Sequence, residues 1–78
     1  MGTAPLSKGM RLLINGENRV FSDAGDGLSL QDLLRRLELP GDRVAVERNG
    51  NLVRRPSHGQ TRLTDGDVLE IVTLVGGG

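Results

Sequence analysis

One run of leucines constrains the fold of this 78-residue chain more than any other feature. The leucines fall at positions i, i+3, i+4 and i+7: Leu30, Leu33, Leu34 and Leu37. This spacing predicts a single amphipathic helix with one apolar face. Ser29 precedes the helix as an N-cap, with Asp32 three residues on, and Pro40-Gly41 is expected to end it. The rest of the chain must therefore supply a second layer that covers the apolar face.

The other periodic segments have the two-residue alternation of β-strands. Strands are predicted at residues 10–14, 20–21, 44–47, 52–53 and 68–72. Asn15-Gly16 and Asn49-Gly50 are expected to close two hairpins, because both residue types tolerate a positive φ. The last strand is apolar on both faces, which suits the centre of a sheet, parallel to the first strand. The predicted class is therefore α+β, a mixed sheet of four to five strands with one helix on one face, in the β-grasp (ubiquitin-like) order.

The alternation within the last strand assigns its side chains to two faces. Leu69 and Ile71 are predicted to point to the helix, whereas Val68 and Val72 point away. Leu13 would share the helix-free face and leave an apolar patch there, a feature that often marks a contact surface. For the two valines, packing within a central strand is the alternative. The candidate partner-docking residues are Leu13, Val68, Val72 and Leu74.

Both ends differ in composition from the predicted domain at residues 10–72. Residues 1–9 lack any period and are expected to be a disordered leader or a cloning remnant. Residues 73–78 form a predicted flexible tail that closes on Gly76, Gly77 and Gly78. Glycine accepts almost any backbone conformation, so this tail, about 20 Å long when extended, can thread into the active site of a partner. The alternative is a frayed end or a cloning remnant without a function.

The composition excludes several kinds of chemistry. The chain has no cysteine, which excludes thiolate nucleophiles, disulfides and cysteine-based zinc sites. It also lacks a phosphate-binding loop, and we predict no catalytic residue and no metal site. Ten basic residues balance ten acidic ones, so no net field favours nucleic acid or a membrane surface. With no signal peptide or bilayer-length apolar run, a cytoplasmic location is expected.

Three polar features are interpreted as having no binding or catalytic role. His58 lies in the polar segment 54–60 and is expected to be solvated rather than to act as a ligand or base. Arg54-Arg55 is expected to be solvated surface, with an ion-pairing patch for a partner as the alternative. Asp65-Gly66-Asp67 lacks the further oxygen ligands of a calcium loop and is predicted to be a turn.

Several segments together point to a known family. They are Ile14-Asn15-Gly16-Glu17, Val44-Ala45-Val46-Glu47-Arg48-Asn49-Gly50, Thr61-Arg62-Leu63 with Asp65-Gly66-Asp67, and Leu69-Glu70-Ile71-Val72 leading to Val75-Gly76-Gly77-Gly78. Through them, residues 10–78 resemble the ThiS family of sulfur carriers of thiamin biosynthesis, relatives of the MoaD proteins. The resemblance implies a protein cosubstrate with no bound cofactor rather than an enzyme.

The same resemblance implies how the carrier works. A ThiF-like adenylating enzyme would use ATP and Mg²⁺ to adenylate the Gly78 carboxylate. Sulfur derived from a cysteine desulfurase would convert the adenylate to a thiocarboxylate, and a ThiG-like thiazole synthase would accept that sulfur. The chemistry is consistent, because a carboxylate with a pKa of about 3.3–3.7 is an anion and a poor electrophile until adenylation supplies a leaving group.

Other functions remain open on the sequence alone. One is a MoaD-type carrier for molybdenum cofactor or a ubiquitin-like protein modifier. Another is a β-grasp interaction or RNA-binding module whose tail is dispensable. The Asn-Gly-Glu hairpin and the Val-Gly-Gly-Gly ending favour ThiS over MoaD, and the even charge balance weighs against RNA.

Overall fold

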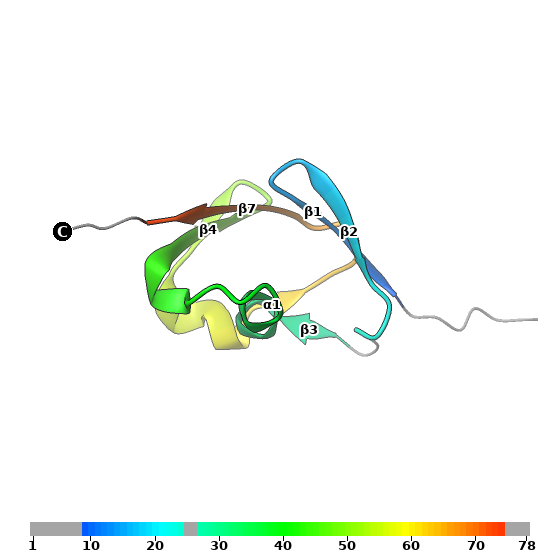
Figure 1. Cartoon of the computed structure of the whole chain (residues 1–78), viewed down its shortest axis with the longest axis horizontal. Helices are drawn as coiled ribbons and strands as arrows, with labels where there is room; N and C mark the ends of the chain where they lie inside the picture. Colours follow the sequence, from blue (N-terminus) through cyan, green and yellow to red (C-terminus); the bar gives the residue numbers. More distant parts are fainter. Residues whose placement is uncertain (1–8, 25–26, 75–78) are drawn as a thin grey trace, which may run out of the picture.

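A mixed five-stranded sheet and one short helix form the two layers of the molecule (Figure 1). The computed structural model describes residues 9–24 and 27–74. In chain order the elements are β1 (Met10–Ile14), β2 (Glu17–Phe21), β3 (Leu28–Ser29), α1 (Leu30–Arg36), the 3₁₀ turn η1 (Gly41–Arg43), β4 (Val44–Arg48), β5 (Asn51–Val53), the 3₁₀ turn η2 (Arg55–Gln60), β6 (Arg62–Leu63) and β7 (Val68–Thr73). The predicted α+β class and β-grasp order are confirmed.

Strand β7 occupies the centre of the sheet, whose order is β2-β1-β7-β4-β5. It runs parallel to β1, with Leu13 opposite Val68, and antiparallel to β4, with Ala45 opposite Val72. The central place of β7 and its parallel pairing with β1 follow the prediction drawn from its two apolar faces, whereas the pairing with β4 was not predicted. A second sheet, formed by β3 and β6 alone, was not predicted. Each of its strands is two residues long, too short for a periodic pattern to reveal.

The core lies between the sheet and α1. Leu12, Val46 and Leu69 from the sheet are fully buried against Leu30 and Leu33 from the helix. The leucine stripe is therefore core, and each buried leucine stabilises the fold by about 1.5–3 kcal/mol. Ser29 caps the helix as predicted, since its Oγ accepts the Asp32 N–H at 3.0 Å.

Helix α1 ends earlier than the sequence predicted. Its last residue is Arg36, and Leu37 is the C-cap. Glu38 then adopts a left-handed conformation, with φ of 60°. The Glu38 N–H donates to Arg35 O at 3.0 Å and the Leu39 N–H to Leu34 O at 2.9 Å. These two bonds make a Schellman motif, which closes the helix before Pro40-Gly41 is reached.

Replacing Glu38 by glycine is expected to stabilise the protein. An L-residue in this conformation is strained by about 1–2 kcal/mol, while glycine loses more chain entropy on folding, so Glu38→Gly should raise the free energy of unfolding by about 0.5–1 kcal/mol. Urea denaturation measures the change. Glu38→Ala retains the Cβ and is the matched control. Equal stabilities for the two variants would show that the backbone at residue 38 is not strained.

Candidate functional site

Two Asn-Gly turns lie on either side of the central strand β7. Asn15 and Asn49 both have φ of 51°, and the glycines that follow them also have positive φ. Each turn joins two antiparallel strands, as predicted: β1 to β2 and β4 to β5. The structure adds that both asparagine side chains bind the backbone of β7.

Asn15 extends the pairing of β7 beyond the end of β1. Its Oδ1 accepts the Ile71 N–H at 2.7 Å, and its Nδ2 donates to Ile71 O at 3.1 Å. The Asn15 backbone N–H donates to Leu69 O at 2.9 Å. One side-chain amide thus replaces a strand residue in the ladder, and it holds β7 close to the point where the predicted tail begins.

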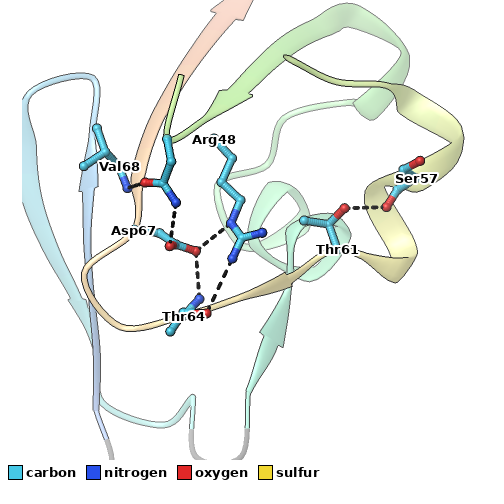
Figure 2. Close-up of polar contacts among 7 residues, drawn as sticks. Arg48, Ser57, Thr61, Thr64, Asp67 and Val68 are labelled. Atoms are coloured by element: carbon cyan, nitrogen blue, oxygen red, sulfur yellow. Dashed lines mark hydrogen bonds and ion pairs between the residues drawn. The ribbon is translucent and has the colours of Figure 1, made fainter. Parts of the chain in front are cut away.

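Asp67 anchors the start of β7 (Figure 2). Its Oδ2 accepts hydrogen bonds from Arg48 Nε and from the Thr64 N–H, each at 2.8 Å, and its Oδ1 accepts one from Asn49 Nδ2 at 3.0 Å. Asn49 Oδ1 in turn accepts the Val68 N–H at 2.9 Å. Burial raises the pKa of Asp67, but the bonds from Asn49, Thr64 and Arg48 outweigh burial and leave the pKa below its usual value.

The predicted turn at Asp65-Gly66-Asp67 is present, with Gly66 at φ 93°. Sequence reasoning missed the buried role of Asp67, which holds the β6–β7 connection to the β4–β5 hairpin. The missed signal was the spacing of Thr64 and Asp67, because an aspartate side chain readily binds a backbone N–H three residues away in a turn.

The far end of β7 is tied to the chain beside η1. Strand β7 extends through Thr73, which pairs with Val44, and the Leu74 N–H donates to Arg43 O at 2.7 Å. In Figure 1 the tip of β7 lies close to the green segment in which η1 leads into β4. Of the predicted tail 73–78, Thr73 therefore lies in the ladder opposite Val44 of β4, and Leu74 hydrogen-bonds to Arg43 of η1. The predicted site residues Gly76, Gly77 and Gly78 lie outside the described residues, as do residues 1–8 of the predicted leader.

The four predicted docking residues, here called the outer patch, are Leu13, Val68, Val72 and Leu74. Leu13 is half-buried, and the exposed fractions of the other three are 39%, 57% and 50%. Val68 and Val72 face away from the helix as predicted, since their neighbours Leu69 and Ile71 are in the core. Two further exposed apolar residues were not predicted as candidates: Val20 and Leu52.

Two carboxylates lie on the same face as the outer patch. Glu47 of β4 is directly opposite Glu70 of β7, and both side chains are exposed. Among residues 9–24 and 27–74, neither is in an ion pair. Like charges directly opposite each other in a sheet are unfavourable. A cationic group on a partner would relieve that repulsion.

His58 is not solvated, so this expectation was wrong. The residue is 4% exposed, and its Nε2 lies 3.1 Å from Val53 O. Because a carbonyl oxygen only accepts hydrogen bonds, Nε2 carries the hydrogen and donates a hydrogen bond to Val53 O. The polar composition of segment 54–60 concealed this, since η2 packs against α1 and turns His58 inward. Arg54 and Arg55 are exposed, as expected.

Comparison with known proteins identifies the family. The family model of ThiS matches residues 12–78. The chain belongs to the ThiS family. It is 42% identical over 68 residues to the sulfur carrier protein ThiS of Bacillus subtilis, a match that covers 86% of this chain and 98% of that protein. The crystal structure of ThiS from Geobacter metallireducens is 33% identical, with a TM-score of 0.74 over 88% of this chain and all of that one.

A second kind of relative is much longer. The thiazole synthase of Paramagnetospirillum magneticum is 45% identical to this ThiS-family chain over 69 residues, or 88% of its length. The match covers 20% of that protein, so the chain spans about a fifth of the length of that relative. None of the helices in the described ranges is long and apolar enough to span a bilayer.

Proposed function

We propose that this ThiS-family chain is a sulfur carrier of thiamin biosynthesis that works through the carboxylate of Gly78. The observation that carries the proposal is the family match through residue 78, together with 42% identity over nearly all of a ThiS carrier. The match to ThiS favours this function over a MoaD-type carrier, a protein modifier or an RNA-binding module. The chain is a carrier rather than a catalyst, and the residues that catalyse each step belong to its partners.

The proposed chemistry needs only a free acid on this chain. An adenylating enzyme with bound ATP and Mg²⁺ joins the Gly78 carboxylate to AMP and releases pyrophosphate. A persulfide that originates from a cysteine desulfurase then attacks the carbonyl carbon and displaces AMP. Cleavage of the sulfur–sulfur bond by a second thiol leaves the thiocarboxylate. The persulfide and the thiol both come from partners, because this chain contains no cysteine.

The fold supports this role by fixing the base of the tail. Asn15 and the bond from Leu74 to Arg43 hold the last part of β7 to its neighbours. Four residues follow Leu74, and by covalent geometry they reach at most about 14 Å. A partner that docks on the body of the carrier would therefore find Gly78 within a limited radius, which raises its effective concentration at the active site.

The thiazole synthase relatives support the identity of the acceptor. In the protein from Paramagnetospirillum magneticum, a segment similar to 88% of this chain is part of a polypeptide named thiazole synthase. Joining a carrier to the enzyme that takes its sulfur would make their encounter intramolecular. We therefore propose a thiazole synthase as the acceptor and a ThiF-like enzyme as the activating partner.

The outer patch is the proposed docking surface for these partners. It combines exposed apolar side chains with the opposed carboxylates Glu47 and Glu70. Such a surface suits a partner that presents apolar residues together with arginine or lysine.

Val72→Asp is expected to weaken binding of the adenylating enzyme by about tenfold or more, since a buried charge without a partner is unfavourable at an interface. The free energy of unfolding should change less than binding does, because Val72 is 57% exposed. Isothermal titration calorimetry measures the affinity. Ser57→Asp makes the same charge change on the exposed surface of η2 and is the control. Unchanged affinity in Val72→Asp would remove Val72 from the docking surface.

Intact-mass analysis tests the proposed function directly. The protein is incubated with a ThiF-like enzyme, MgATP, a cysteine desulfurase, cysteine and a reductant. The expected product has one oxygen replaced by sulfur at the C-terminal carboxyl group. If the mass stays unchanged while ThiS of Bacillus subtilis is converted in a parallel reaction, the proposal is wrong.

A further inference from the structure

A pocket of about 540 Å³ lies among α1, η1 and η2. Its size falls in the range of small-molecule sites, roughly 300–1,000 Å³. Part of its wall is apolar, formed by Leu34, Leu39, Pro40 and Pro56. The function proposed above makes no use of this pocket.

His58 supplies the pocket with a hydrogen-bond acceptor. Its Nε2–H is committed to Val53 O, so in the neutral ring Nδ1 is an unprotonated acceptor. Within residues 9–24 and 27–74, Nδ1 has no hydrogen-bond partner. In the same residues, every side-chain nitrogen or oxygen that is completely buried does have a hydrogen-bond partner. Nδ1 is therefore not completely removed from solvent, although the residue as a whole is only 4% exposed. It lies beside Gly41, where an added Cβ would be 3.9 Å away, and both residues line the pocket.

Charges of both signs line the same pocket without neutralising each other. Arg55 and Asp42 are exposed lining residues, and in the described part of the chain neither forms an ion pair. Arg35 adds a second guanidinium to the lining. Its Nη1 is 3.8 Å from Asp32 Oδ1, and because both side chains are exposed this ion pair is weak. The pocket therefore offers cations from α1 and η2, and acceptors from Asp42 and His58 Nδ1.

We propose that this pocket binds a free α-amino acid with an aliphatic side chain. The carboxylate of the ligand interacts with Arg55 and Arg35, and its ammonium group with Asp42 and His58 Nδ1. The side chain packs on the apolar wall that includes Leu34 and Leu39. An anion alone would leave Asp42 unmatched, and an amine alone would leave Arg55 unmatched. A zwitterion satisfies both charges.

Titration of the ¹⁵N-labelled full chain with L-leucine tests the proposal. We expect saturable shifts at the amides of residues 41–42 and 55–60 and at the ring nitrogens of His58. Two matched probes each lack one charge: 4-methylpentanoate has no amine, and 3-methylbutylamine has no carboxylate. Each should bind at least about tenfold more weakly than leucine, because one charge-assisted contact is lost. No saturable shift with leucine, or equal binding of 4-methylpentanoate, would overturn the proposal.

Exposed variants distinguish the two charges. Arg55→Gln and Asp42→Asn should each weaken leucine binding by about tenfold, while the neighbouring changes Arg54→Gln and Glu38→Gln should not. Asp42→Asn should not weaken 4-methylpentanoate, and Arg55→Gln should not weaken 3-methylbutylamine. Equal losses in the control variants would contradict the assignment. Thiocarboxylate formation measured on the same variants should be unchanged, so failure of this proposal is distinguishable from failure of the carrier function.

Discussion

A chain that lacks Gly77 and Gly78 is expected to lose thiocarboxylate formation entirely while it keeps its fold. The core residues and the ladder of the large sheet lie within residues 10–74, so removing two glycines beyond them should leave unfolding unchanged. The remaining carboxylate would be about 7 Å short of its position in the intact chain. Because a misplacement of about 1 Å can slow a reaction about a hundredfold, a displaced carboxylate would not react with the α-phosphate of ATP in the proposed adenylating enzyme.

Three measurements separate chemistry from folding in this variant. Intact mass reports the thiocarboxylate, a urea melt reports stability, and growth of a carrier-deficient strain without thiamin reports function. One residue added after Gly78 should be equally damaging, since it moves the terminal carboxyl group by about 3.5 Å. One residue added before Met1 is the matched control and should change none of the three measurements. Growth supported by the truncated chain would refute the proposed role of Gly78.

The sheet order could be predicted because several independent signals agreed. The two Asn-Gly turns predicted the hairpins, the leucine stripe predicted the helix, and the two apolar faces of segment 68–72 predicted a central strand. Each signal reflects burial or a local backbone requirement, which a single sequence carries directly. The orientation of Val68 and Val72 followed from the same two-residue period.

Contacts between segments distant in the sequence could not be predicted in this way. His58 is buried because η2 folds back onto α1, and nothing in the polar segment 54–60 records that packing. The end of α1 depends on a left-handed glutamate, although glycine is the usual residue at such a position. The bonds from Asn15 to Ile71 join residues 56 positions apart.

The candidate functional site likewise has parts that the sequence predicted and a part that only the structure revealed. The glycines at residues 76–78 were recognised from composition and resemblance, and their role stays a proposal because they lie outside the described residues. The outward orientation of the outer patch followed from strand alternation and agrees with the exposure of Val68, Val72 and Leu74, while its role in docking stays a proposal. The opposed pair Glu47 and Glu70 emerged only from the register of β4 and β7.

Asp67→Ala is expected to destabilise the protein by about 3–5 kcal/mol, because it removes one partner of a mostly buried ion pair. Arg48 Nε, Asn49 Nδ2 and the Thr64 N–H would all lose their acceptor, although Arg48 is partly solvated and can recover some hydration. Urea denaturation measures the loss. Asp42→Asn, which alters an exposed carboxylate outside this cluster, is the control. A loss below about 1 kcal/mol would show that water replaces Asp67 without penalty.

The same carboxylate predicts how stability depends on pH. The folded-state pKa of Asp67 is lowered, so the unfolded chain binds the proton more tightly than the native one. The contribution of Asp67 is therefore fully present above the unfolded pKa of about 4, and it is lost as the pH falls through the lower folded value. Asp67→Asn should flatten the fall of unfolding free energy between neutral and acid pH. Some slope should remain, because the hydrogen bond from Arg36 also lowers the pKa of Asp23. An unchanged slope in Asp67→Asn would mean that the hydrogen bonds to Asp67 do not favour its charged form.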